Sequence, residues 1–265
     1  MYTSSPTEIL SIKDLGIGLV MPLLVIGMIF LQRLKIAKLY VYALLRATLQ
    51  LALIGYVLKL IFGLDSGLAV VAYLFCVVGM AAFIVFRLQR KPLPAFYPIL
   101  GVAIFLGSFF SISLVTQVVM KISPWYNPRY LIPIAGMIIG NTMTASALAL
   151  ERLRDDIRQT RQKVETLISL GASSSQATRE SINRALKAGL MPNITSMMGV
   201  GLVHLPGMMT GQMIAGNAPT QAVRYQLLVS FMLSAAVGIT ALVTLHLSAR
   251  RHFTPAHQLR EEMIV

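Results

Sequence analysis

The stretch ERLRDDIRQTRQKVETLISLGASSSQATRESINRALKA, residues 151–188, is the one long polar run in an otherwise apolar chain. Within it, Leu153, Ile157 and Val164 recur at the spacing of one helical face, which predicts an amphipathic helix. Gly171 follows, and glycine commonly supplies the left-handed residue that ends a helix. The run therefore predicts a helix that projects from a hydrophobic segment and then reverses.

A second helix is expected after the reversal. Ser173 is followed three residues later by Gln176, the pattern of a capping box that opens a helix. Glu180 and Arg184 stand four residues apart, an arrangement that favours an ion pair on one face. We therefore expect a helical hairpin over residues 151–188, with a short tip at 167–175.

Composition places the chain in a membrane. Of its 265 residues, 56% are hydrophobic and only 12% charged, about half the charge of a soluble domain. The net charge of +13 does not indicate nucleic acid as a partner, because the basic residues lie between apolar segments instead of on a folded polar domain. The single cysteine, Cys76, excludes a disulfide framework and a cysteine-based metal cluster.

Seven apolar segments predict an all-α polytopic membrane protein with about seven transmembrane helices. A cytoplasmic helical hairpin is expected between helices 5 and 6, and residues 1–265 form a single transmembrane domain. The segments are 15–31, 41–62, 67–86, 96–120, 130–150, 190–215 and 222–247. The segment 190–215 is interrupted by Pro206-Gly207.

The distribution of Lys and Arg predicts the orientation. With seven spans and the N-terminus outside, most of the 23 basic residues fall in cytoplasmic stretches, and the C-terminus is cytoplasmic. The alternative is six spans with the N-terminus inside. That arrangement strands Arg33, Lys35 and Lys38 on the outer face, against the positive-inside rule.

Polar residues within the apolar segments are candidates for a substrate pathway. His204, Met208 and Gln212 follow one another at four-residue spacing, and Pro206-Gly207 frees backbone carbonyls as in the broken helices of transporters. His204 and Met208 are also candidate metal ligands. The alternative is that His204 bonds a neighbouring helix and the methionines pack.

Small residues mark a further helix face. Gly136, Gly140 and Thr144 stand at four-residue spacing, which lets two helices approach closely. Asn141 lies beside them, and we favour packing over direct substrate contact by Asn141.

Arg46 and Gln50 share one face of the segment 41–62, either within the bundle or, for Arg46, near lipid phosphate. No Asp or Glu lies inside any proposed span, although hard cations such as ferric iron prefer oxygen ligands. The cargo is therefore a complexed metal, a softer ion, or another molecule, such as an anion met by Arg46.

The decapeptide VETLISLGAS contains Glu165 and, six residues later, Gly171. It resembles the E-A-A-x-x-x-G signature of ABC-transporter permeases, whose coupling helix docks on the ATPase subunit. Thr166 and Leu167 replace the two alanines. The segment that begins at residue 130, if it continues as one helix to Leu170, would be roughly 60 Å long at 1.5 Å per residue, and about half of that length would cross the membrane. The expected coupling residues are Glu165, Leu167, Ile168, Leu170 and Gly171, the three apolar ones exposed unless a partner covers them.

Longer runs carry a wider resemblance: RATLQLALIGYVL (46–58), IPIAGMIIGNTMTASALALERL (132–153), residues 168–216, and AVRYQLLVSFML (222–233). These are similar to the FetB-like family of iron-export ABC permeases, whose plant members are associated with aluminium tolerance and a nucleotide sugar. The resemblance implies a homodimeric permease subunit in a bacterial inner membrane, exporting iron or another metal, with a separate ATPase as partner.

The chain has no G-x-x-x-x-G-K-[ST] loop, so we expect ATP and Mg on the partner, no cofactor on this chain, and no enzymatic activity of its own. Two other classes of membrane protein are alternatives. One is a stand-alone secondary transporter, which would often show internal repeats and membrane carboxylates. The other is a seven-span sensor or receptor.

Overall fold

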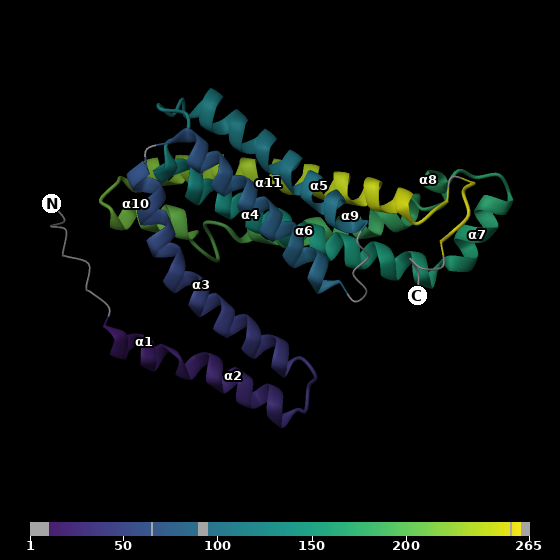
Figure 1. Cartoon of the computed structure of the whole chain (residues 1–265), viewed down its shortest axis with the longest axis horizontal. Coiled ribbons are helices and arrows are strands. Elements are labelled where there is room, and N and C mark those ends of the chain that lie inside the picture. The colour runs from purple at the N-terminus through teal and green to yellow at the C-terminus, as the bar shows by residue number, and fades with distance from the viewer. Residues whose placement is uncertain (1–10, 65, 90–94, 255, 261–265) are drawn as a thin grey trace. The chain divides into compact units, whose positions relative to one another are not determined.

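The computed structural model describes residues 11–64, 66–89, 95–254 and 256–260, and in these ranges it confirms an all-helical fold without a β-sheet (Figure 1). The helices are α1 (Ile12–Gly18), α2 (Val20–Leu31), α3 (Ala37–Leu64), α4 (Gly67–Leu88), α5 (Phe96–Ser113), the π-helix η1 (Leu114–Val119), α6 (Pro128–Gln159), α7 (Arg161–Ser169), α8 (Ser174–Ala177), α9 (Arg179–Gly199), α10 (Gly207–Ile214) and α11 (Pro219–Arg251).

Six helical stretches of the described residues are long and apolar enough to cross a membrane. They are Lys13–Leu31, Ala37–Leu64, Gly67–Leu88, Phe96–Val119, Pro128–Gln159 and Pro219–Arg251. The segment 190–215 is not among them, because α9 ends at Gly199 and α10 begins only at Gly207. Gly201 has a left-handed φ of 82° and Pro206 has no N–H to donate, so the α-helical hydrogen-bond ladder stops between them.

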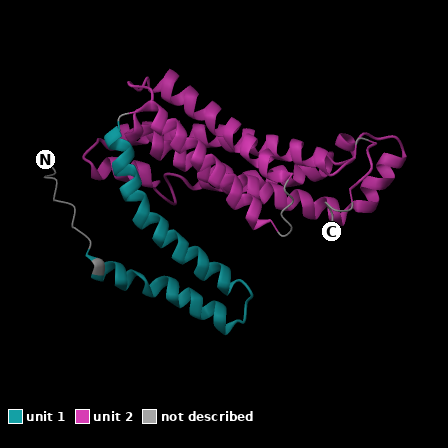
Figure 2. Cartoon of the chain, in the orientation of Figure 1, with its two compact units in different colours: residues 1–64 teal, residues 65–265 magenta. Residues whose placement is uncertain are grey.

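The chain divides into two compact units, residues 1–64 and 65–265 (Figure 2). In unit 1, α1 and α2 make up the first candidate span and α3 the second. The Ser11 side chain caps α1 by accepting from the Lys13 N–H, and the Asp14 carboxylate accepts from the Ser11 N–H at 2.8 Å. Most apolar side chains of this unit are exposed, as expected for helices that face lipid.

Unit 2 is built around α6 and α11. Helix α6 packs against α4, α5, α9 and α11, and α11 packs also against α5, α9 and α10. The side chains of Ile138, Leu150, Val237 and Leu245 are completely buried between these helices. Figure 1 shows α6 and α11 running along the length of unit 2, with α10 at one end and α7 and α8 at the other.

Two glycines allow the closest helix crossings in unit 2. A Cβ atom added at Gly107 of α5 would lie 2.7 Å from the main-chain oxygen of Ala236 in α11 and 2.0 Å from Thr240 Oγ1. A Cβ atom at Gly189 of α9 would lie 2.9 Å from the main-chain oxygen of Ala145 in α6. Both positions therefore require glycine, because a backbone atom of the neighbouring helix occupies the space.

The predicted crossing at Gly136, Gly140 and Thr144 is wrong for contacts within this chain. A Cβ atom at either glycine would meet nothing within 4 Å. The Thr144 hydroxyl donates to the Gly140 carbonyl at 3.1 Å, and the Asn141 amide donates to the Met137 carbonyl at 2.8 Å. This face of α6 is open in the single chain because α9 and α11 cover other faces of the helix.

We predict that Gly107→Ala destabilises the protein by about 1–3 kcal/mol, the usual effect of overpacking a tight contact. Gly101→Ala, on the same helix, is the control, because a Cβ atom there meets nothing within 4 Å. It should leave stability unchanged or raise it by up to about 1 kcal/mol through helix propensity. Thermal unfolding in detergent measures both, and equal effects would contradict the described α5–α11 crossing.

Candidate functional site

Residues 151–188, the hairpin, fold back on themselves as predicted, but the first arm is not one continuous helix. Helix α6 ends at Gln159, and Thr160 (φ −103°, ψ 20°) separates it from α7. The Asp156 carbonyl accepts both the Thr160 hydroxyl at 2.7 Å and the Thr160 N–H at 2.9 Å, and such bonding of a threonine back to the preceding turn often bends a helix. The prediction of an unbroken helix to Leu170 is therefore wrong.

The tip of the hairpin has a defined backbone geometry. Gly171 has a φ of 93°, as predicted for the residue that ends the first arm. Its N–H donates to the Ile168 carbonyl at 2.9 Å, and the Ala172 N–H donates to the Leu167 carbonyl at 3.0 Å. This pair of hydrogen bonds is a Schellman motif, in which a glycine at the left-handed position closes a helix end.

The second arm begins with the predicted capping box. The Ser173 N–H donates to Gln176 Oε1 at 2.9 Å, and the Gln176 N–H donates to Ser173 Oγ at 3.4 Å. The arm consists of the short α8 and then α9, separated by Thr178. The Schellman turn that closes α7 and the capping box that opens α8 thus leave a tip of only a few residues between the two arms.

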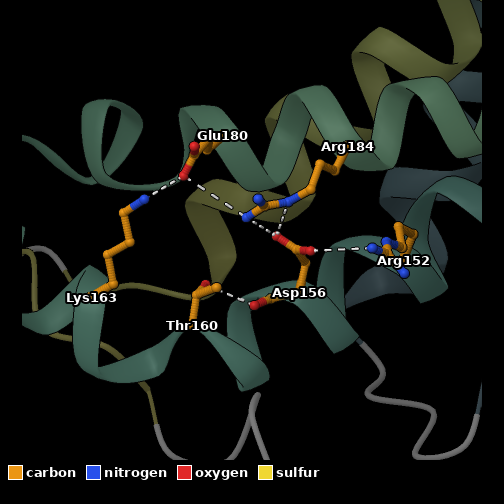
Figure 3. Close-up of polar contacts among 6 residues, drawn as sticks. All are labelled: Arg152, Asp156, Thr160, Lys163, Glu180 and Arg184. Atoms are coloured by element: carbon orange, nitrogen blue, oxygen red, sulfur yellow. Dashed lines mark hydrogen bonds and ion pairs between the residues drawn. The ribbon is translucent and has the colours of Figure 1, made fainter.

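An ion-pair network joins the two arms (Figure 3). Asp156 is buried on α6, and Arg184 of α9 donates to its Oδ2 through Nε at 3.0 Å and Nη2 at 2.8 Å. Arg152 lies 3.7 Å from the other carboxylate oxygen. Glu180 pairs with Arg184 at 3.9 Å, as predicted, and Lys163 of α7 binds the same Glu180 oxygen. The network therefore links α6, α7 and α9.

The contacts in this network shift the pKa values of two ionisable groups. The hydrogen bond from Lys163, with the charges of Lys163 and Arg184, holds the pKa of the Glu180 carboxyl below its ordinary value. The hydrogen bond to Asp156 raises the pKa of Arg184. Both side chains are well exposed, so solvent screens these effects. Most of the stability that the network contributes therefore comes from the contacts of the buried Asp156 carboxylate.

Asp156 was missed in the sequence, although a signal is present. It stands three residues after Leu153 and beside Ile157, so it lies on the apolar face of the amphipathic helix. A carboxylate on a buried face needs a partner, and Arg184 supplies it from the other arm.

The apolar residues near the tip are partly covered by the chain itself. Val164, Ala177 and Phe253 form a buried cluster, and Leu167 and Ile168 are half-buried against it. The expectation that only a partner could cover Leu167 and Ile168 is therefore wrong. Phe253 comes from the tail after α11, and its contact with the hairpin was not predicted from the sequence.

Leu170 is the apolar residue of the tip that stays outside. Its side chain is 80% exposed, at the C-cap of α7 beside Gly171. Glu165, one turn before the helix end, accepts from Arg161 Nε at 2.7 Å and is about half exposed. The carboxylate thus has a partner within its own helix.

The tail is anchored by His252, which follows α11 and is completely buried. Its Nδ1 lies 2.8 Å from the Ser248 carbonyl, its ring lies 5.8 Å from the ring of Phe96, and its own carbonyl accepts from the Arg260 N–H at 2.8 Å. Burial lowers the pKa of His252 to about 4. The imidazole is therefore neutral near pH 7, and it anchors the tail through Nδ1 and its ring contact, while Nε2 is buried without a hydrogen-bond partner among the described residues.

The predicted stripe of His204, Met208 and Gln212 is not one continuous helical face. His204 is exposed in the turn after α9, whereas Met208 and Gln212 are half-buried one turn apart on α10. The residues of the described chain include no group of three or more His, Cys, Asp or Glu that could hold a metal ion. His204 and Met208 are therefore not part of any such group.

The remaining candidates lie elsewhere. Asn141 is exposed on the open face of α6 in unit 2. Arg46 and Gln50 lie one turn apart on α3 in unit 1. The structure brings together the coupling candidates at the hairpin, and it brings together Met208 and Gln212, but not the whole predicted pathway.

The fold thus defines a helical, multi-pass membrane protein with a rigid polar hairpin and one interrupted apolar segment. Comparison with known proteins identifies it further: the chain belongs to the uncharacterised protein family UPF0014, whose model matches residues 12–253. The predicted FetB-like relationship is therefore confirmed. No solved structure matches this chain.

The relatives are bacterial and plant membrane proteins. The chain is 37% identical over 244 residues to the Arabidopsis thaliana protein ALUMINUM SENSITIVE 3, covering 92% of this chain and 88% of that protein. It is 36% identical to the rice UPF0014 membrane protein STAR2, covering 89% and 81%. It is 31% identical to the probable iron export permease protein FetB of Escherichia coli, covering 93% and 94%.

The ion-pair network can be tested by substitution. We predict that Asp156→Asn lowers stability by about 1.5–3 kcal/mol, the range for hydrogen bonds to charged groups. Glu151→Gln, an exposed carboxylate on the same helix, is the control and should have little effect. Because Asp156 and Arg184 act as one pair, the double substitution with Arg184→Gln should destabilise less than the sum of the single ones. Full additivity in thermal unfolding would show that the pair does not hold the hairpin.

Proposed function

We propose that this chain is the permease subunit of an ATP-driven ABC transporter and that the hairpin is its coupling element. The observation that carries the proposal is the tip: a Schellman turn at Gly171 presents the exposed Leu170 at the end of a doubly anchored hairpin. An exposed leucine on a rigid polar projection suits a small apolar contact with a soluble partner. The E-A-A-x-x-x-G resemblance at Glu165–Gly171 supports an ATPase as that partner.

The packing of the hairpin supports transmission of force from this tip. Asp156 and Arg184 tie α6 to α9, and the tail residues Phe253 and Leu259 tie α7 to the end of α11. Helices α6, α9 and α11 then run together toward the interrupted segment at the opposite end of unit 2 (Figure 1). A displacement at the tip would therefore move helices as packed bodies, because close-packed interiors transmit strain.

The cargo is proposed to be iron or another metal, moved outward as the ion or as a complex. The support is the similarity to a protein described as a probable iron export permease. In this proposal two copies of the chain work with two copies of the ATPase, which binds ATP and Mg, and this chain binds no cofactor. The site of action is a bacterial inner membrane.

The proposal includes seven spans, an outside N-terminus and a cytoplasmic hairpin. The end of α9, the turn 200–206 and α10 would together make the interrupted crossing between the hairpin and α11. Irregular backbone at membrane depth is tolerated where it lines a cavity or is buried in protein. The charge distribution then agrees with the positive-inside rule.

Cysteine accessibility tests this topology in a Cys76→Ser background, since Cys76 is exposed. A cysteine at Ala218 should react in intact cells with an impermeant thiol reagent, and one at Ser175, which is exposed on the hairpin, should not. A cysteine at Ser5, outside the described residues, should also react. Protection of Ser5→Cys with reactive Ala218→Cys would contradict the seven-span arrangement.

Coupling is tested at the tip. Gly171→Val should abolish transport and weaken co-purification of the ATPase, because a β-branched residue opposes the φ of 93°. Gly171→Asn is the matched control, since asparagine tolerates left-handed backbone. Leu170→Ser should weaken ATPase binding while thermal stability stays unchanged, because the exposed leucine side chain makes few contacts in the isolated chain.

The charge at Glu165 provides a second arm of the same experiment. Glu165→Lys would place a positive charge beside Arg161 and should also abolish transport, while the protein still inserts in the membrane. Leu202→Ser, at a leucine of the interrupted segment that is 91% exposed, is the control for Leu170→Ser and should keep the ATPase bound. Normal ATPase binding and transport by the Gly171→Val and Glu165→Lys variants would exclude the hairpin as the coupling element.

A further inference from the structure

A cavity of about 230 Å³ lies in unit 2 between the interrupted segment and the first part of α11. Gly201, Leu205 and Met209 contribute to one wall, and Gln226 and Ser230 of α11 to the other. Gln226 and Ser230 lie roughly 10 and 17 Å along α11 from its first residue, at 1.5 Å per residue. Since α11 is a candidate span, the proposed topology places the cavity in the outer part of the crossing.

The amide of Gln226 is the main polar group of this cavity. The residue is only 8% exposed, and its Oε1 makes no hydrogen bond within the described chain. Ser230, one turn later, donates to the main-chain oxygen of Gln226 at 2.9 Å, so it does not satisfy the side chain. A buried acceptor without a donor is destabilising, so Gln226 Oε1, which has almost no accessible surface in the described chain, would be stabilised by a ligand donor that meets it when the side chain turns into the cavity.

The interrupted backbone adds further acceptors. The N–H groups of residues 201–204 donate to the carbonyls of Gly199 and His204. Val200 and Gly201 line the cavity, and their carbonyls receive no backbone donor among the described residues. Transporters use such unwound carbonyls at membrane depth to hold their cargo.

The charge and size of the cavity restrict what it can hold. Its lining side chains are all uncharged, and Leu205 and Val223 give it apolar walls. A bare multivalent cation would lose its hydration without gaining a counter-charge there, which is strongly unfavourable. The volume is many times the roughly 10–15 Å³ that a single water needs, which suits a small complex better than a single ion.

We propose that this cavity binds a small metal complex of zero or low net charge, whose outer N–H or O–H groups donate to Gln226 Oε1 and to the free carbonyls of the turn. The inference rests on the proposed transport function and names its cargo class. A complex neutralised by its own ligands avoids the desolvation penalty of a bare ion, and its apolar surface fits the aliphatic walls. The cargo contacts then come from Met209 and Gln226, and not from the predicted stripe of His204, Met208 and Gln212.

The test uses the full chain in mild detergent and the neutral tris(acetohydroxamato)iron(III) complex, a small probe with outward N–H groups. Equilibrium dialysis with iron quantification should show saturable binding. Gln226→Leu should weaken binding by about tenfold or more, because it removes the buried acceptor. Gln221→Leu, an exposed glutamine on the same helix and outside the cavity, should leave the affinity unchanged.

A second variant pair fills the cavity without touching its polar group. Val223 is 40% exposed at the cavity wall, so Val223→Trp should fold and block binding, whereas Val203→Trp, on the exposed turn, should not. Within α10, Met209→Leu should weaken binding more than Met208→Leu, since only Met209 lines the cavity. Size-exclusion profiles confirm that each variant is folded.

Two outcomes would overturn the inference. One is the absence of saturable binding by the probe. The other is binding of Fe²⁺ alone, under anaerobic conditions, as tight as that of the complex and unaffected by Gln226→Leu. Because the measurement needs no ATPase, a negative result leaves the coupling proposal to its own test at Gly171 and Leu170.

Discussion

The hairpin end of unit 2 depends on one buried carboxylate. Asp156 sits on the apolar face of α6, where an unpaired charge would be strongly destabilising, and Arg184 of α9 compensates it from the other arm. The pair therefore favours the register in which Arg184 of α9 lies against Asp156 of α6. Lys163 and Glu180 extend the same pairing to α7, and the apolar cluster of Val164 and Phe253 secures the opposite side. Rigidity at the tip follows from these two contacts together.

The opposite end of unit 2 has the reverse character. There the backbone between Gly199 and Gly207 is irregular, Leu202 and Val203 are almost fully exposed, and a buried amide at Gln226 lacks a partner. A region joined by ion pairs and a region with an interrupted backbone are thus connected by the long helices α6, α9 and α11. Buried polar atoms without a hydrogen bond among the described residues occur at both ends, because His252 Nε2 is one of them. This division agrees with the coupling proposed for the hairpin and the binding proposed for the cavity.

Much of the fold was predictable, because its signals are local. Apolar length and composition identified six of the seven segments as candidate spans, and glycine and capping-box chemistry located the hairpin reversal at Gly171 and Ser173. The four-residue spacing at Gly136 and Gly140 did not predict a crossing within this chain correctly, since it indicates only that small residues line one face of the helix. The close crossings occur at Gly107 and Gly189, which stand in four-residue series of the same kind (Ala103, Gly107 and Ser111; Ala185 and Gly189), so the spacing alone does not tell which series meets a neighbouring helix.

The sequence by itself determined the membrane class, the helical composition, the hairpin and its turn residues. Hydrophobicity and left-handed glycine geometry act within a few residues and need no tertiary partner. The tertiary structure alone decided that Asp156 pairs with Arg184, that Phe253 covers Leu167 and Ile168, and that Gln226 faces a cavity beside Met209. These contacts join residues far apart in the chain, and periodicity along one helix carries no information about which surface a distant helix will present.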